Sequence, residues 1–334
     1  MGKQEEILKI FPGYMRERLE KPLERADKLE EIRLGIGRPV RFLIAGEEFF
    51  LSGRGGISRG FQDAWHVTER EMEEIIKNVC LYSMYAFENE IRQGFLTIPG
   101  GHRIGLAGQV VLNENGSIRN MAHIRFLNIR ISHQIIGAAD QVMKFLYAGK
   151  RFCNTLLISP PGGGKTTLLR DIVRQVSTGN PAGKGRQVGV VDERSEIAGS
   201  FMGIPQNDVG MRTDVLDGCP KIQGMMLLMR SMSPEVVAVD EIGGYEDMKA
   251  VYQVLQCGSS VLATMHGASM EDIRKQINTG IPGQKGGQVF YKPEDFFERY
   301  IFLERGQEGC RIREILGRDG NLLEAGRKEL LCCS

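Results

Sequence analysis

Three consecutive glycines, a lysine and two threonines occupy residues 162–167, three residues after an apolar run at 155–158. Backbone N–H groups of glycines can converge on one anion because no Cβ stands in the way, and a following helix directs its positive dipole end to the same place. The lysine of such a loop reaches the β- and γ-phosphates of a nucleotide, and the next hydroxyl binds Mg²⁺. The predicted nucleotide contacts are Pro161, Gly162, Gly163, Gly164, Lys165, Thr166 and Thr167, with Thr166 also at the metal.

The first position of this motif departs from its usual form. The pattern G-x-x-x-x-G-K-[ST] asks for glycine, and this chain has Ser159 there. The alternative is a glycine-rich turn followed by an ordinary lysine. The apolar strand before the loop and the helical spacing of Leu168, Leu169 and Ile172 after it favour a phosphate loop. The pattern leaves open whether the site hydrolyses a nucleotide or only binds it.

A second group of candidate residues ends the apolar run at 236–239. Asp240 and Glu241 follow directly, in the segment SPEVVAVDEIG. We predict that Asp240 lies near Mg²⁺ and that Glu241 orients and deprotonates an attacking water, because phosphoryl transfer mainly requires positioning and charge neutralisation. An exposed acidic strand end is the alternative, and the order of the two motifs along the chain argues against it.

Two further apolar runs end in polar side chains. VVDERSEI at 190–197 supplies Asp192, Glu193 and Glu196, which could polarise water or hold the metal through water. VLATMHGAS at 261–269 supplies Thr264 and His266, which could sense the γ-phosphate. Read alone, the first segment could equally be a solvated acidic loop and the histidine a structural one.

The second half of the chain alternates strands and helices, as a parallel α/β sheet requires. We predict two long, glycine-bearing loops at 199–218 and 280–288, which are long enough to be functional, and a closing hairpin over 311–323. The predicted strands are 155–158, 188–192, 236–240, 261–265 and 300–304, and the predicted helices include 166–177 and 246–257.

The first half predicts a smaller α+β domain. A helix starts after Thr68, which pairs with Glu71 in a capping box. Strands at 103–112 and 118–130 flank turn residues and predict a hairpin. A helix over 138–148 then leads to the phosphate loop. We place the domain boundary near residue 135, which gives an N-terminal domain of 1–135 and a P-loop domain of 136–334.

Composition limits the class of protein. The 334 residues are 42% hydrophobic and 25% charged, with a net charge of +1, as in an ordinary globular protein. This charge predicts no direct nucleic-acid binding and no strong attraction to a membrane surface. No apolar run approaches the ~20 residues that span a bilayer, and no C-x-x-C spacing suggests zinc. We expect a cytoplasmic location.

The four strand ends together resemble the secretion ATPase superfamily of bacterial type II and type IV systems. In that group a P-loop, an acidic box, a second acidic strand and a His-bearing segment follow an N-terminal domain in this order. The segments EIRLGIGRPV at 31–40, 85–111 and 127–142 are similar to a sporulation branch of the superfamily from endospore-forming bacteria. The resemblance implies an α/β fold with a RecA-like P-loop ATPase domain after a smaller α+β domain.

The resemblance also implies a function and its residues. It implies ATP and Mg²⁺ as cofactors and a homo-hexamer on the mother-cell side. There the ATPase would be peripheral to the membrane through sporulation channel membrane proteins, and hydrolysis would drive assembly or operation of a mother cell to forespore channel. Alternatives are a nucleic-acid-dependent P-loop ATPase and a non-catalytic nucleotide-gated scaffold. The implied catalytic residues are Glu241, Glu193, Glu196 and His266, with Arg103, Arg212 and Arg230 as candidates for charge stabilisation, some across a subunit interface.

Overall fold

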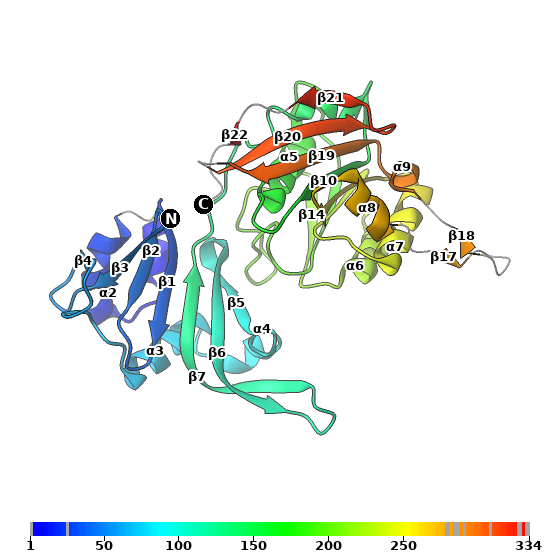
Figure 1. Cartoon of the computed structure of the whole chain (residues 1–334). Helices are drawn as coiled ribbons and strands as arrows, with labels where there is room; N and C mark the ends of the chain where they lie inside the picture. Colours follow the sequence, from blue (N-terminus) through cyan, green and yellow to red (C-terminus); the bar gives the residue numbers. More distant parts are fainter. Residues whose placement is uncertain are drawn as a thin grey trace. The chain divides into compact units, whose positions relative to one another are not determined.

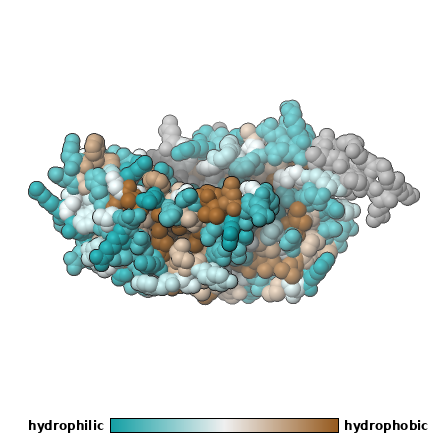
Figure 2. Space-filling model, turned by 90° about the horizontal axis from the view of Figure 1, so that it is seen from below, coloured by the Kyte–Doolittle hydropathy of each residue, from teal (hydrophilic) through white to brown (hydrophobic). Residues whose placement is uncertain are grey.

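The computed structural model describes residues 3–24, 27–277, 281–282, 288–289, 292–306, 309–325 and 329–330. One compact unit ends at His133, and a second begins at Gln134. We call them unit 1 and unit 2 (Figure 1). Within the described ranges, no helix is both long enough and apolar enough to cross a bilayer. On the face shown in Figure 2, hydrophobic atoms form separate patches between hydrophilic side chains.

Unit 1 is built on an antiparallel sheet with the strand order β4-β3-β2-β1-β7-β6-β5. Alternation of side chains along each strand gives the sheet a buried face and an open face. In β1, Ile32 and Leu34 are buried and Arg33 between them is exposed. The strands are β1 Leu29–Gly35, β2 Arg41–Ile44, β3 Glu47–Leu51, β4 Ile57–Ser58, β5 Phe95–Ile98, β6 His102–Leu112 and β7 Ile118–Arg130, and the α-helices are α1 Lys3–Leu8, α2 Gly13–Leu23, α3 Glu69–Val79 and α4 Glu88–Gln93.

Two local predictions for unit 1 are confirmed. The Thr68 hydroxyl accepts the N–H of Glu71 at 3.2 Å, and a Glu71 carboxylate oxygen accepts the N–H of Thr68 at 2.7 Å, which completes the capping box of α3. Strands β6 and β7 form the predicted hairpin, closed by the bond from Asn113 N–H to the Ser117 carbonyl.

Unit 2 contains a mixed sheet with the order β14-β13-β15-β16-β10-β19-β20-β21, and β22 also pairs with β20. Pairings from β14 to β19 are parallel, whereas β20 to β22 add antiparallel strands at one side. The main strands are β10 Thr155–Ser159, β13 Val188–Asp192, β14 Thr213–Asp217, β15 Val236–Val239, β16 Ser260–His266, β19 Arg299–Arg305, β20 Cys310–Gly317, β21 Leu322–Ala325 and β22 Glu329–Leu330.

Helices cover both faces of the unit 2 sheet, so its strands are apolar on both sides. Helix α5 packs its Leu168 and Ile172 into one core cluster, and α6 and α7 pack Met225 and Val251 into the other. The helices are α5 Lys165–Thr178, α6 Lys221–Ser231, α7 Tyr245–Gln256, α8 Met270–Ile277 and α9 Pro293–Phe296, and short two-residue ladders are β8 Tyr147–Ala148 with β9 Arg151–Phe152, β11 Gly179–Asn180 with β12 Gly183–Lys184, and β17 Ile281–Pro282 with β18 Gln288–Val289.

The predicted helix over 138–148 is wrong. The segment instead forms turns and a short 3₁₀ helix at Met143–Phe145, and it ends in β8. The Asp171 carboxylate on α5 accepts the N–H of Ala139 at 2.8 Å, so a tertiary contact replaces a helical one. The apolar residues are still buried against α5, and their periodicity reflects this packing rather than a helix.

The loop predictions had mixed outcomes. The segment 199–218 is not one loop, because β14 at Thr213–Asp217 pairs in parallel with β13 as the outermost strand. The segment 280–288 lies mostly outside the described residues. The closing hairpin is confirmed by the antiparallel pairing of β20 with β21 around the turn at Asp319 and Gly320.

Candidate functional site

The phosphate loop connects β10 to α5 at the carboxyl edge of the parallel strands. Gly162 has φ +72° and Gly164 has φ +80°, a backbone region that side-chain-bearing residues rarely adopt. Gly164 is the N-cap of α5 and offers no side chain to the helix N–H groups. The first-turn N–H groups are therefore available to an anion bound in the loop.

Lys165 is buried and folded back over the loop. Its ammonium donates to the carbonyls of Ser159 at 3.0 Å and Pro160 at 3.3 Å, and its Nζ lies 3.0 Å from Nδ1 of His266. Burial lowers the pKa of Lys165, and the nearby carboxylates of Asp240 and Glu241 oppose this shift. The contacts are ones that an incoming phosphate could replace.

Ser159, the departure from the motif, is fully buried. Its hydroxyl donates to the Pro160 carbonyl at 2.7 Å, and a Cβ added to Gly163 would lie 2.6 Å from the Ser159 Cβ. The serine side chain thus fills the space beside Gly163, and its hydrogen bond fixes the backbone at the start of the loop. It leaves the loop glycines in their required conformations.

Four neighbouring strands deliver the other candidate residues to one edge. Ser159 at the end of β10 is in register with His266 at the end of β16. Strand β15 lies between β16 and β13, and its last residue, Val239, precedes Asp240 and Glu241. The structure therefore brings the phosphate loop, the second acidic pair and His266 together at the site expected for a doubly wound sheet.

Asp240 binds two hydroxyl groups. The Thr166 hydroxyl donates to Asp240 Oδ2 at 2.8 Å, and the Thr264 hydroxyl donates to Asp240 Oδ1. Carboxylate and hydroxyl oxygens are hard donors, the type that Mg²⁺ prefers. Thr166 and Asp240 therefore fit the predicted metal role by chemistry, although the described residues contain no group of three or more His, Cys, Asp or Glu side chains arranged to hold a metal.

Glu241 is held in an unusual backbone conformation with φ +53°. Its N–H donates to the Thr264 hydroxyl at 2.8 Å, and its carbonyl accepts the Lys221 ammonium at 2.6 Å. Its carboxylate lies 3.1 Å from His266 Nε2 and 3.2 Å from Arg194 Nη1. A left-handed backbone at a non-glycine residue persists only where its surroundings fix it, and such positions cluster at functional sites.

Asp192 differs from the prediction that it acts on water or metal. It is buried, and its two carboxylate oxygens accept the backbone N–H groups of Glu196, Ile197 and Ala198. Burial raises the pKa of Asp192 to about 6, and these hydrogen bonds oppose the rise. Asp192 therefore shapes the acidic loop.

Glu193 and Glu196 lie on the same loop and line a small cavity with Asp240 and Glu241. The cavity volume is about 20 Å³, enough for one water molecule. Glu193 also lies 3.6 Å from the Lys221 ammonium. The acidic box and the second acidic pair thus face one small, polar space.

Lys221 and Arg194 line this cavity and were not predicted. Lys221 opens α6 and contacts Glu193, the Glu241 carbonyl and, at 3.8 Å, Asp247. Arg194 could have been predicted from the segment VVDERSEI, because a cationic side chain between carboxylates is expected to pair with them. No local pattern marked Lys221, because its partners come from three separate segments.

Of the three predicted arginines, Arg212 and Arg230 belong to unit 2 and lie away from the phosphate loop, and Arg103 belongs to unit 1. Arg212 donates to the carbonyls of Ser177 at 2.9 Å and Thr178 at 3.4 Å, at the opposite end of α5 from Lys165. Arg230 is exposed in the last turn of α6. Arg103 belongs to β6 of unit 1, with its guanidinium 3.8 Å from the Phe95 ring centroid. Arg212 and Arg230 therefore do not reach the phosphates of their own chain in this arrangement.

Comparison with known families decides the relationship. The model of the family described as "Sporulation stage III, protein AA" matches residues 1–323. The chain belongs to this family. It is also 41% identical over 319 residues to "Stage III sporulation protein AA" of Bacillus subtilis (strain 168), covering 95% of this chain and 96% of that protein. The family relationship predicted from the sequence is confirmed.

Solved structures confirm the fold. The Legionella pneumophila ATPase DotB aligns with a TM-score of 0.59 at 15% identity, covering 92% of this chain and 83% of that one. The pilus retraction motor PilT with bound ADP aligns with a TM-score of 0.61 at 16% identity, covering 90% and 82%. This member of the sporulation family therefore has the α/β fold of secretion ATPases.

Proposed function

We propose that this chain is a Mg²⁺-dependent ATP hydrolase whose nucleotide cycle serves a transport channel between mother cell and forespore. The observation that carries the proposal is the contact chain Lys165–His266–Glu241, with spacings of 3.0 and 3.1 Å. It connects the phosphate-binding lysine to the carboxylate proposed to activate water. A loop that only held phosphate would not need this connection.

The residues divide the work. Lys165 and the α5 N-terminus hold the β- and γ-phosphates, and Thr166 and Asp240 would hold Mg²⁺, which when bound neutralises phosphate charge. Glu241 orients the attacking water and accepts its proton, with His266 fixing the carboxylate. Preorganised charge of this kind supplies most of the rate enhancement in phosphoryl transfer.

The sporulation family and the likeness to DotB and PilT support a role at a secretion-type channel. We further propose a homo-hexamer on the mother-cell side, attached to the membrane through channel proteins. In such an assembly, Arg103, Arg212 or Arg230 could act on the nucleotide of a neighbouring subunit. We also propose the domain division at residue 135 as the functional one, with the smaller domain moving against the ATPase domain.

The test is an ATPase assay of the purified chain over a protein concentration series. We expect turnover per chain to rise with concentration, because an assembly completes the site. Lys165→Ala should abolish nucleotide binding, whereas Glu241→Gln should keep binding and lose hydrolysis. Equal loss of binding in both variants would contradict the role of Glu241. Stimulation by DNA with a steep salt dependence would favour a nucleic-acid-dependent ATPase instead.

Sporulation of a variant strain distinguishes the ATP hydrolase from a non-catalytic, nucleotide-gated scaffold. A strain carrying Glu241→Gln should fail to complete sporulation if hydrolysis is required. Normal sporulation with this variant would support nucleotide gating without turnover. Lys165→Ala in the same strain is the matched control, because both readings require nucleotide binding.

A further inference from the structure

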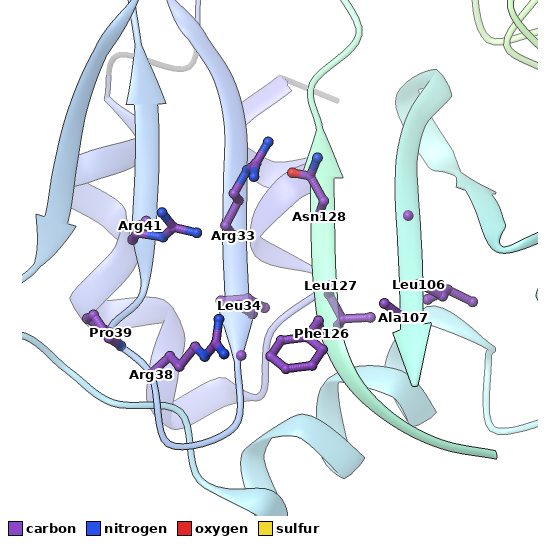
Figure 3. A pocket seen from close by; sticks show the side chains of 12 residues that line it. Arg33, Leu34, Arg38, Pro39, Arg41, Leu106, Ala107, Phe126, Leu127 and Asn128 are labelled. Carbon is purple, nitrogen blue, oxygen red and sulfur yellow. The ribbon is translucent and has the colours of Figure 1, made fainter. Parts of the chain in front are cut away.

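The open face of the unit 1 sheet contains a hollow of about 400 Å³ (Figure 3). Its floor includes Gly35 on β1 and Gly105 on β6, which are in register with Phe126 and Asn128 of β7. Because glycines carry no side chain, the sheet surface is low at these two points. A volume of this size falls in the range of small-molecule sites.

Arg33 and Arg41 stand directly opposite each other on β1 and β2, at one side of the hollow. Like charges at directly opposed positions destabilise an antiparallel pair. Each arginine is held by a carboxylate, Arg33 by Glu31 at 2.8 Å and Arg41 by Glu48 at 3.2 Å. These pairs are partly exposed and each contributes little to stability, so an anion with more acceptor oxygens can replace them.

Two further groups in the hollow are incompletely satisfied. The Arg38 guanidinium lies 4.8 Å from the centroid of the Phe126 ring, and it has no ion pair within the described part of the chain. Figure 3 shows Arg38 and Phe126 side by side below Arg33 and Arg41. The Asn128 Oδ1 atom is buried and has no hydrogen-bond partner among the described residues. A buried acceptor of this kind requires a donor, and the residues that the structure describes do not supply one.

We propose that this hollow, the arginine pocket (Arg33, Arg38, Arg41, Phe126 and Asn128), binds a small phosphorylated ligand of nucleotide size. A phosphate carries up to two negative charges and three acceptor oxygens, so one group can satisfy two opposed guanidiniums that otherwise repel. Each of the two arginines already pairs with one carboxylate of the chain, so a ligand with a single carboxylate would add little. The exposed Phe126 ring presents its edge to a planar base of the ligand, and Asn128 Oδ1 accepts a hydrogen bond from an amino group of that base.

The arginine pocket belongs to unit 1, and its residues do not include any of the phosphate-loop residues. The proposal therefore does not depend on ATP hydrolysis. It can be tested in the full chain carrying Lys165→Ala, which suppresses nucleotide binding at the loop. The single tryptophan, Trp65, supplies a local signal, because its carbonyl accepts the N–H of Val40 at 2.9 Å, between Arg38 and Arg41.

The experiment is a titration of Trp65 fluorescence with AMP, with pyrophosphate as the second probe. We expect saturable binding of AMP, tighter than that of pyrophosphate because the base adds contacts. Arg33→Gln and Arg38→Gln should each weaken binding by ~10-fold or more, as expected for a charge-assisted hydrogen bond. Asn128→Asp, which preserves shape but adds a negative charge, should abolish it. Arg119→Gln, an equal charge change at an exposed position of β7, is the control and should have no effect.

Three outcomes would overturn the proposal. One is the absence of a saturable response to AMP. Another is a response that the arginine-pocket variants leave unchanged, which would locate the binding elsewhere. The third is preferential binding of a hexaglutamate peptide that is lost in the same variants, which would make the pocket a site for an acidic protein segment. Unchanged circular dichroism of each variant ensures that a loss reports on the site.

Discussion

The Lys165 ammonium and the His266 imidazole lie 3.0 Å apart across the ends of β10 and β16. Nδ1 of His266 faces Lys165, and Nε2 of the same ring faces Glu241 at 3.1 Å. A phosphate that binds Lys165 therefore competes with His266, as well as with the carbonyls of Ser159 and Pro160, for the three N–H donors of the ammonium. The arrival of nucleotide is coupled in this way to the ring that positions Glu241.

The first prediction concerns His266→Ala. Removing the competing acceptor should raise the affinity for ATP by roughly 2- to 10-fold, the equivalent of one hydrogen bond. Hydrolysis should fall, because Glu241 loses a partner. Equilibrium titration with a fluorescent ATP analogue and a turnover assay measure the two effects, with the exposed His66→Ala as control. A loss of affinity as large as that in Lys165→Ala would contradict the coupling.

The second prediction uses the contact between Ser159 and Gly163. Gly163→Ala should severely impair nucleotide binding, because the new Cβ would lie 2.6 Å from the Ser159 Cβ. Ser159→Gly removes that obstacle and restores the usual motif. The double variant should therefore regain much of the lost binding, although the Pro160 carbonyl at 3.0 Å still limits it. Binding is measured by the same titration. Equal defects in the single Gly163→Ala and the double variant would show that Ser159 is not the obstacle.

The third prediction concerns Lys221, which contacts the Glu241 carbonyl at 2.6 Å. Lys221→Met should lower kcat by roughly 10-fold or more and leave nucleotide affinity nearly unchanged, because Lys221 fixes the backbone of Glu241 without reaching the phosphate loop. Lys221→Arg should restore part of the rate. Lys249→Met on the exposed side of α7 is the matched control. A parallel fall in affinity and kcat would indicate a direct contact with nucleotide instead.

The fourth prediction concerns pH and the fully buried His102. Burial, with the positive charges of Lys3 and His133, lowers the pKa of His102 to about 4. The Nδ1 atom accepts the N–H of Ser132 at 3.0 Å, so the folded state holds the ring neutral. The unfolded chain, with a pKa of about 6.5, binds a proton between pH 6.5 and 4 that the folded state does not. The contribution of His102 to the free energy of unfolding should therefore fall as pH drops through this window, by up to about 3 kcal/mol, whereas the raised pKa of Asp192 acts in the opposite direction.

Urea unfolding followed by Trp65 fluorescence measures this dependence. His102→Asn keeps an acceptor for Ser132 and removes the titration. It should lower the free energy of unfolding at neutral pH, and the difference between the original chain and the variant should narrow as pH drops from 6.5 to 4. The same substitution at the exposed His66 should leave the slope unchanged. A difference between the original chain and His102→Asn that stays constant over this pH range would contradict the role of His102.

Local patterns were enough to predict much of the fold. The phosphate loop, the parallel strands before each polar strand end, the Thr68 capping box and both hairpins depend on neighbouring residues, and the structure contains them. The helix expected over 138–148 failed because its apolar spacing served burial against α5, and Asp171 supplied the hydrogen bond that a helix would have made. Strand β14 was missed because its pairing with β13 is a contact between distant segments.

The residue types that end each strand could be predicted from the amino-acid sequence, and so could their meeting at one edge of a parallel sheet. The role of each side chain at that edge depends on contacts that the fold creates. Asp192 and Asp240 each stand at the end of an apolar run. The Asp192 carboxylate accepts hydrogen bonds from three backbone N–H groups of its own loop, whereas the Asp240 carboxylate accepts them from the hydroxyls of Thr166 and Thr264. A buried polar group must form hydrogen bonds with whichever partner the fold places within reach, and spacing along the chain does not encode that partner.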